Sequence, residues 1–290
     1  MMKKKKNIIT AAACIVLLAG IGWVLWGNTA LMIQEYTVTS ERLPDAFSGF
    51  RIAQVSDLHN DVFGKDNVRL IDKLSESDPD IIVLTGDLID SRRTNTAVAV
   101  DFARQALQIA PVYYVSGNHE SRMMDTFEQL ADELEQLGVC VLRDEAVTVE
   151  KDGAEIQLIG LDDIGFYYTV YQERLSGMTR EELALENISR LRDEEMYSVL
   201  LSHRPELMEV YAESGCDLVF SGHSHGGQFR LPVIGGLYAP GQGIFPEYDG
   251  GVYTSGSTKM VVSRGVGNSL MPVRFNNRPE VVVVELQVGE

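Results

Sequence analysis

Short apolar runs alternate with amphipathic stretches along most of the chain, and turn-forming residues separate them. Five of these runs are typical of buried β-strands and cover residues 51–56, 81–85, 111–116, 197–202 and 218–221. The intervening patterns predict helices near 66–75, 95–109, 122–137, 180–194 and 206–214, with Asp66 as the N-cap of the first. This alternation predicts a sheet whose neighbouring strands are largely parallel.

The second half of the chain is richer in strand patterns. Further strands are predicted over 140–142, 146–150, 155–161, 258–263 and 280–286, with a hairpin turn at 151–153. They indicate a second sheet packed on the first, so we expect an α/β fold with two packed mixed β-sheets flanked by helices. Residues 51–290 would form one domain, and the weakly patterned residues 28–50 a connector without regular structure.

The N-terminal segment differs from the rest of the chain. Lys3 to Lys6 precede the apolar run Ile8 to Trp26, whose only clearly polar residue is Thr10. As a helix this run would be about 28 Å long, which matches the hydrocarbon core of a bilayer. A cleaved signal peptide is the alternative, but its apolar region usually has only about 7–15 residues. We favour an uncleaved transmembrane helix within residues 1–27, ending at the interfacial aromatic Trp26, with the lysines in the cytoplasm and the catalytic domain outside.

Composition and charge reduce the number of possible partners and functions. The chain has 290 residues and a formal net charge of −17, and without the four N-terminal lysines 21 basic face 42 acidic residues. Such a surface repels nucleic acid, so no nucleic-acid partner is expected. Cys140 and Cys216 lie in apolar surroundings. We interpret them as two reduced, buried thiols, with one disulfide between them as the alternative.

All five histidines of the chain follow short strand-like runs: His59, His119, His203, His223 and His225. The last two belong to Gly222-His223-Ser224-His225-Gly226, in which the glycines allow close backbone approach and positive φ. Carboxyl ends of parallel strands meet at one edge of a sheet, where ligands bind. The pattern therefore predicts that the histidines share one metal-binding pocket.

Five sequence blocks together resemble the calcineurin-like metallophosphoesterase superfamily. They are Asp57-x-His59, Gly86-Asp87, Gly117-Asn118-His119-Glu120, His203 and Gly222-His223-x-His225. Their order and residue types match across residues 51 to 227, and the Gly226-Gly227-Gln228 and Ser263-Arg264-Gly265 segments resemble the membrane-anchored bacterial branch. The resemblance implies the four-layer sandwich of that superfamily.

The resemblance also implies a centre with two divalent metal ions. Asp57, His59 and His225 would hold one ion, and Asn118, His203 and His223 the other. Asp87 would bridge the two ions, since a carboxylate has two oxygens. Nitrogen and oxygen ligands without thiolate suit manganese, iron or zinc better than calcium or a structural zinc.

The expected reaction is phosphoester hydrolysis by a phosphatase or phosphodiesterase, in which a metal-bridging hydroxide attacks phosphorus in line. By resemblance, His119 would protonate the leaving group, and Asp90 would orient His119 and raise its pKa. Asp90 could equally be a helix cap. A non-catalytic metal-binding scaffold is the alternative function, and a hydrolase of a non-phosphate bond is a third. The complete set of ligands argues against the scaffold.

Other residues near these blocks have two interpretations. We expect Glu120 and Arg204 to be structural or surface residues, and Asp162-Asp163 to form either the pocket rim or a turn. The apolar residues of the loop 226–251 could accept a lipid-linked or other cell-envelope substrate beside a membrane. We favour the other interpretation, in which they pack the loop against the sheet.

Overall fold

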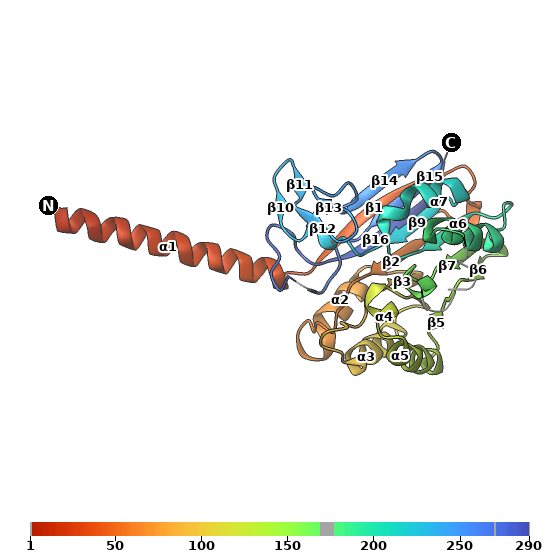
Figure 1. The fold of residues 1–290 in the computed structure, drawn as a ribbon, viewed down its shortest axis with the longest axis horizontal. Coiled ribbons are helices and arrows are strands. Elements are labelled where there is room, and N and C mark those ends of the chain that lie inside the picture. Colours follow the sequence, from red (N-terminus) through yellow and green to blue (C-terminus); the bar gives the residue numbers. More distant parts are fainter. Residues whose placement is uncertain (1, 169–176, 270, 290) are drawn as a thin grey trace.

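The computed structural model describes residues 2–168, 177–269 and 271–289, which form two six-stranded sheets flanked by helices (Figure 1). The first sheet has the order β1 (Met32–Ser40), β16 (Glu280–Val288), β2 (Arg51–Val55), β3 (Ile81–Thr85), β4 (Val112–Val115) and β5 (Cys140–Val141). Strands β2 to β5 are parallel, and β16 runs antiparallel to β2 but parallel to β1. The α/β prediction of two mixed sheets is confirmed.

The second sheet has a parallel centre and antiparallel edges. Its order is β14 (Gly251–Ser255), β15 (Thr258–Val262), β9 (Leu218–Ser221), β8 (Ser198–Leu201), β7 (Ala154–Gly160) and β6 (Glu145–Lys151). Only the outer pairs β14–β15 and β6–β7 are antiparallel. After β9, two small hairpins are made by β10 (Arg230–Leu231) with β11 (Gly235–Gly236) and by β12 (Tyr238–Ala239) with β13 (Gly243–Ile244).

Helices cover the outer face of each sheet. The first sheet packs against α2 (Val68–Glu76), α3 (Thr96–Ala106) and α5 (Met124–Leu137), and the second against α6 (Arg180–Leu191) and α7 (Met208–Ser214). Shorter helices are α4 (Asn118–Ser121), η1 (Asp45–Phe47), η2 (Lys65–Asn67), η3 (Phe166–Tyr168), η4 (Pro205–Leu207) and η5 (His225–Gly227).

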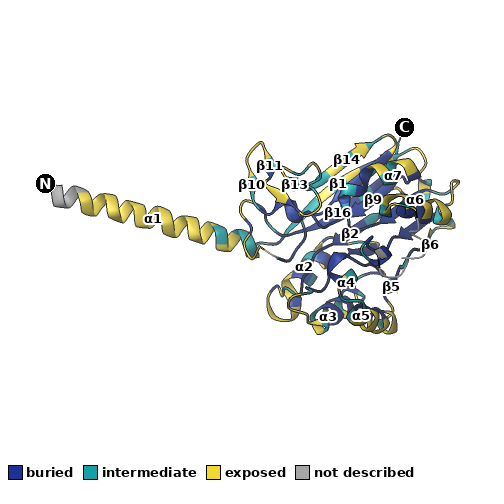
Figure 2. Cartoon of the chain, viewed as in Figure 1, coloured by how far each residue is buried: buried dark blue, intermediate teal, exposed yellow. Residues whose placement is uncertain are grey.

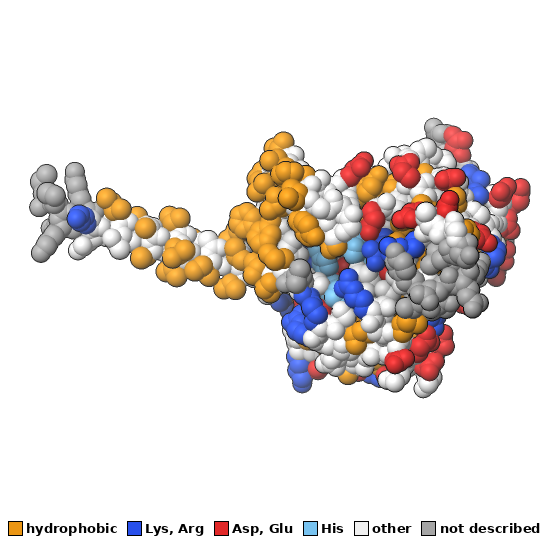
Figure 3. Space-filling model, viewed as in Figure 1, with side chains coloured by type: hydrophobic (Ala, Val, Ile, Leu, Met, Phe, Trp, Pro, Cys, Tyr) orange, Lys and Arg blue, Asp and Glu red, His pale blue; other side chains and the backbone are white. Residues whose placement is uncertain are grey.

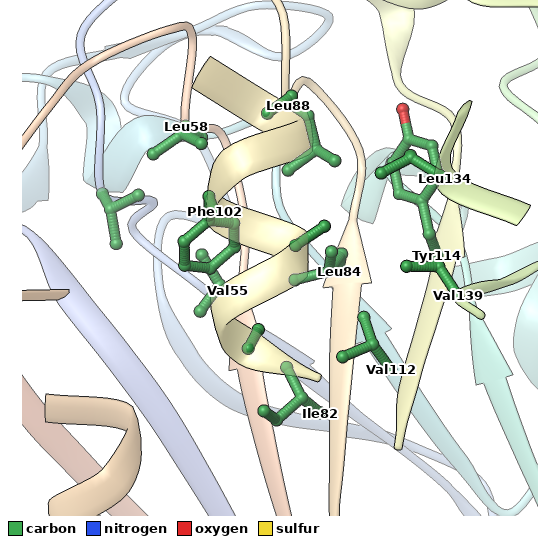
Figure 4. Packing of buried hydrophobic residues seen from close by; sticks show 14 of the residues in the cluster. Val55, Leu58, Ile82, Leu84, Leu88, Phe102, Val112, Tyr114, Leu134 and Val139 are labelled. Atoms are coloured by element: carbon green, nitrogen blue, oxygen red, sulfur yellow. The ribbon is translucent and has the colours of Figure 1, made fainter. Parts of the chain in front are cut away.

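Side-chain alternation along the central strands produces the layers. Ile82 and Leu84 of β3 point toward the helices, where Leu84 lies near Phe102 of α3 (Figure 4). Ile81 and Val83 point the other way, into the core between the two sheets. Figure 2 shows that the central strands are buried, and because they are covered on both faces they are largely apolar.

Two local predictions were wrong. Regular structure begins before residue 51, because β1 lies inside the expected connector and pairs along its whole length with β16. Asp66 does not cap α2, since it has a φ of 53° inside η2, and Asn67 precedes the helix instead. The Asn67 side chain accepts a hydrogen bond from the Phe63 N–H, which fixes this turn.

A long helix, α1 (Met2–Thr29), precedes β1 and extends away from the two sheets (Figure 1). Its part from Lys6 to Thr29 is long and apolar enough to cross a membrane. The length and composition expected for the N-terminal segment are therefore present in the structure.

Candidate metal centre

The predicted site residues come together at one edge of the two sheets. Loops after β2, β3 and β4 contribute from the first sheet, and loops after β8 and β9 from the second. Direct hydrogen bonds join the sheets beneath these loops. His203 Nδ1 lies 2.7 Å from the Thr85 carbonyl oxygen, and Gln54 Nε2 donates to the Ser221 carbonyl at 2.8 Å. The two sheets thus form a single base for the site.

Two groups of side chains could each hold a metal ion. Asp57, His59 and His225 form the Asp57 cluster, and Asp87, His203 and His223 form the Asp87 cluster. In the Asp57 cluster, His225 Nε2 lies 3.3 Å from Asp57 Oδ1 and 3.1 Å from His59 Nε2. The two clusters match the expected division of the histidines between two ions. Asp87 was expected to bridge both ions, and here it is grouped with His203 and His223.

Asp87 lies between the two clusters. Its Oδ2 is 3.5 Å from His59 Nε2 and 3.3 Å from His203 Nε2, so one oxygen faces both groups. Its Oδ1 accepts a hydrogen bond from the His119 backbone N–H at 2.8 Å. The expected bridging by Asp87 stays a prediction, and Oδ2 is the oxygen that faces both clusters.

Unpartnered polar atoms test whether these residues fit a metal. His203 Nε2, His223 Nε2 and Asn118 Oδ1 are buried and have no hydrogen-bond partner among the described residues. Because the Thr85 carbonyl can only accept, His203 Nδ1 carries a proton, and Nε2 faces Asp87 Oδ2 at 3.3 Å. Burial lowers the pKa of His203, but Asp87 outweighs burial and raises this pKa to about 10, so Nε2 carries a positive charge or binds a cation beside the carboxylate. The residues therefore fit divalent metal ions.

The two aspartates of the clusters are ionised. Burial favours the neutral carboxyl, but His203 outweighs it and holds the pKa of Asp87 well below its usual value. Burial likewise raises the pKa of Asp57, but His225 and His59 lower it by a larger amount. The net shift of this pKa is therefore downward. Ionised carboxylates are the form that binds metal ions.

Five of the seven expected ligands have a left-handed backbone. The φ angles of Asp57, His59, Asp87, His223 and His225 lie between 47° and 66°. Such values are uncommon for residues other than glycine, and they cluster at functional sites where surrounding structure holds them.

Gly222 shows why a glycine precedes the His-Ser-His segment. A Cβ at this position would lie 1.8 Å from Ser56 Oγ and 2.6 Å from Asp57 Oδ2. The loops after β2 and β9 are therefore in direct contact here, and any larger residue would separate them. The expectation of a close backbone approach is confirmed at this glycine.

His119 is oriented differently from our expectation. Its Nδ1 accepts a hydrogen bond from the Ser91 backbone N–H at 2.9 Å, so the ring proton of the neutral form is on Nε2. Asp90 Oδ1 is 3.9 Å from the same nitrogen, and Asp90 instead accepts hydrogen bonds from the backbone and side chain of Arg92. Burial lowers the pKa of His119 to about 4, although the charge of Asp90 acts to raise it. The orienting role of Asp90 stays a prediction.

Distances alone also allow a further grouping of ligand atoms. His59, Asp90 and His119 have atoms within 4.8 Å of one another. His59 Nε2 nevertheless faces Asp57, Asp87 and His225, and only its Nδ1 approaches Asp90, at 3.9 Å.

Glu120 has a larger structural role than its sequence position indicates. It is fully buried, and its carboxylate accepts hydrogen bonds from the backbone N–H groups of Asp87, Gly117 and Ile89 at 2.9, 2.8 and 3.1 Å. It therefore joins the loop that carries Asp87 to the loop that carries Asn118. The signal available in the sequence was its place in the Gly-Asn-His-Glu block.

The residues expected to be structural or at the rim lie below the site. Arg204 pairs with Asp163 at 2.6 Å, which confirms its structural role. Asp162 and Asp163 are buried and bind Ser116, Arg143 and Arg204, so they do not form the pocket rim.

A cavity of about 280 Å³ opens above the clusters. Asp87, Asn118, His119, His223 and His225 line its floor, and Figure 3 shows histidine side chains at the bottom of a hollow. The walls comprise Tyr238 and Pro240 of the loop 226–251, together with four residues that sequence reasoning missed: Arg92, Arg122, Ser269 and Met271. Ser269 Oγ lies 3.3 Å from His119 Nε2, so this histidine nitrogen faces the cavity.

Most apolar residues after Gly226 do not pack against the sheet as expected, although Tyr248 packs against the core beside the second sheet. The exposed apolar side chains of the two hairpins and of the segment 271–275 are here called the apolar rim: Leu231, Val233, Ile234, Leu237, Tyr238, Ile244, Phe245, Met271, Val273 and Phe275. The hairpin strands have only two residues each, and the side chains named above remain on the surface.

Comparisons with known proteins agree with the site. The sequence profile of the calcineurin-like phosphoesterase family matches residues 50–227. The chain is 32% identical over 260 residues to the uncharacterized metallophosphoesterase YkuE of Bacillus subtilis (strain 168), covering 87% of this chain and 84% of that protein.

Two further relatives have informative names. Phosphodiesterase YaeI of Escherichia coli (strain K12) is 28% identical, covering 99% of this chain and 100% of that protein. The transmembrane protein with metallophosphoesterase domain of Bos taurus is 31% identical, covering 87% of this chain and 56% of that protein.

Proposed function

Because the chain belongs to the calcineurin-like phosphoesterase family and is a metal-dependent phosphoester hydrolase, we propose that it uses two divalent metal ions. The Asp57 cluster would hold one ion, and His203, His223 and Asn118 the other, with Asp87 shared between them. The observation that carries this proposal is the set of buried, unpartnered atoms on His203, His223 and Asn118. When bound, such ions lower the pKa of water and neutralise charge on the phosphoryl oxygens, which favours in-line attack on phosphorus.

The protein's own residues would position the substrate above this floor. Arg92 and Arg122 line the cavity and supply positive charge for a phosphate group. His119 Nε2 faces the cavity with its proton, so it can donate a hydrogen bond to the departing oxygen. Asp90 acts as a positioning residue, because it holds the Arg92 guanidinium at 3.0 Å.

The proposed location follows from α1. The helix would cross the cell membrane once, with the N-terminal lysines in the cytoplasm and the phosphoesterase domain outside. In this arrangement residues 1–27 form the anchor, and the domain of residues 51–290 extends back through the connector of residues 28–50 to include β1. The proposed substrate is a lipid-linked or other cell-envelope phosphoester, either a monoester or a diester.

The test is an assay of the purified full chain in detergent, after removal of metal with a chelator and reloading with manganese, iron or zinc. Elemental analysis should find two ions per chain, and the loaded protein should hydrolyse p-nitrophenyl phosphate or bis-p-nitrophenyl phosphate. The Asp57→Asn and His223→Asn variants should each lose one ion. Two bound ions without hydrolysis of any phosphoester would support the scaffold alternative, and a folded chain that binds no metal would contradict the proposal.

A further inference from the structure

The apolar rim is exposed to a degree that is unusual for large hydrophobic side chains. Val233 at the tip of the first hairpin is fully exposed, and Ile244 of the second is 70% exposed. Val233 and Phe245 also have φ angles of 71° and 57°, where glycine or asparagine would be less strained. An exposed apolar surface of this kind, formed at a cost in backbone strain, is typical of an interaction site.

The end of α1 lies next to this surface. Figure 3 shows the apolar side chains of α1 and of the hairpins as one continuous region, with acidic side chains gathered at the opposite end of the molecule. Trp23 and Trp26, in the last turns of α1, are exposed as well. Tryptophan is the residue that settles at the boundary between lipid and water.

Hydrogen bonds fix the end of α1 to the segment that carries part of the apolar rim. Asn28 donates to the Arg274 carbonyl at 2.9 Å and accepts from the Arg274 N–H at 2.7 Å. The Arg278 guanidinium lies 4.9 Å from the centre of the Trp26 ring, and Arg69 donates to the Thr29 carbonyl at 2.6 Å. The helix and the rim therefore have a defined relative position.

We propose that the apolar rim inserts into the interface of the same bilayer that α1 crosses, as a second membrane contact. The occupant is the lipid bilayer because the rim is continuous with the membrane-crossing helix and contains apolar and aromatic side chains. Arg69 and Arg278, beside the end of α1, can pair with lipid phosphates, while the acidic end of the domain points away from an anionic surface.

This contact also determines where the cavity opens. Tyr238 and Met271 belong to the apolar rim and line the cavity at the same time. The cavity mouth would then face the lipid headgroups, and a phosphoester carried on a lipid could reach the floor while its acyl chains remain in the bilayer. This consequence for the substrate rests on the proposed function, whereas the membrane contact itself does not.

The contact can be tested on the full chain in lipid nanodiscs that hold one copy each. A fluorescent dye is attached at Val233→Cys, in a background with Cys14→Ala and Cys140→Ser, and quenched by lipids that carry a spin label. The control is Asp152→Cys in the β6–β7 turn, which lies at the opposite edge of the sheets from the site, because β7 runs parallel to β8 and β9. We expect loss of most of the dye emission at position 233 and little loss at position 152. Equal quenching at both positions, or no quenching at position 233, would overturn the proposal. Quenching that is absent with one copy per disc and appears only in discs prepared with two copies would overturn it as well.

A second measurement separates the contact from catalysis. In the double variant Ile244→Asp with Phe245→Asp, the dye at position 233 should become accessible to a water-soluble quencher, whereas Val252→Asp on β14 should change nothing. The double variant should lose most hydrolysis of a lipid phosphoester in the bilayer and keep its hydrolysis of bis-p-nitrophenyl phosphate. If the unaltered, metal-loaded protein hydrolyses neither ester, the proposed function fails, and the quenching result still decides the membrane contact.

Discussion

The floor of the cavity and the apolar rim are built on opposite principles. The floor gathers side chains from five strand ends of two sheets and buries them, and Glu120 and the Thr85 carbonyl accept hydrogen bonds that hold the Asp87 loop and His203. The rim consists of short hairpins and a loop whose large side chains face outward. The difference indicates separate roles for the two regions: the floor would perform one reaction, and the rim and walls would select the molecule that undergoes it. Changes in the floor should therefore affect all substrates, and changes above it only some.

The largest effect is expected for Asp87→Asn. The substitution removes the charge of the one oxygen that faces both His59 and His203. Hydrolysis of every phosphoester should fall by roughly 10³-fold, since loss of a central electrostatic contact costs at least this order. Steady-state kinetics and elemental analysis check it, with Asp101→Asn on the surface of α3 as the control. Retention of full activity would show that the Asp87 cluster is not the centre of the reaction.

Glu120→Gln should have the next largest effect, although Glu120 does not line the cavity. An amide cannot accept hydrogen bonds with both of its terminal atoms, so at least one of the N–H groups of Asp87, Gly117 and Ile89 loses its partner. The free energy of unfolding should fall by about 1–3 kcal/mol. The shift of the Asp87 loop should lower kcat by roughly 10²-fold with little change in KM. Denaturant unfolding and kinetics measure both quantities, and Glu128→Gln, on the exposed side of α5, is the control. An unchanged kcat would mean that Glu120 stabilises the fold without positioning Asp87.

Arg92→Ala tests the wall between the floor and the rim. We expect KM for a small phosphoester to rise about ten-fold, because a hydrogen bond to a charged group contributes about 1.5 kcal/mol. The metal content should stay unchanged. Arg93→Ala removes the same charge from a neighbouring side chain that is 63% exposed, and it should leave KM nearly constant. Equal effects of the two variants would indicate that only the overall charge matters.

Met271→Ser should have the smallest effect and the most selective one. Methionine at this position lines the cavity and is partly exposed, so lipid would cover it. KM for a lipid phosphoester should rise about five-fold, since burial of part of this side chain contributes about 1 kcal/mol. Hydrolysis of bis-p-nitrophenyl phosphate should not change, and Val252→Ser should affect neither substrate. A similar loss with both esters would assign Met271 to the floor rather than the rim.

The floor could be predicted from the sequence because each of its residues is marked by its immediate neighbours in the chain. Each predicted ligand follows an apolar strand directly, and the order of the motifs from Asp57 to His225 matched the family. The strand β1 could not be recognised, because its partner β16 lies more than two hundred residues away in the chain. The hydrogen bonds of His119 and Asp90 depend on the conformation of the loop at Ser91 and Arg92, which has no periodic pattern.

The exposure of the apolar rim could not be predicted from the sequence either. Apolar residues of a soluble domain are usually buried, and a pattern of residues does not reveal that the side chains of a hairpin such as β10–β11 stay exposed. Only the three-dimensional structure shows that these side chains lie next to the end of α1.

The position of β16 in the first sheet has a consequence for the biosynthesis of the protein. This strand lies between β1 and β2, yet it follows every other described strand in the chain. A ribosome therefore releases α1 and β1 early, while the sheet edge beside β2 remains unpaired until residues 280–288 have emerged. The loop that carries Asp57 and His59 cannot be fully supported before that moment. Hydrolytic activity would then begin only after residues 280–288 have been synthesised, when a membrane-crossing α1 would already have had time to insert.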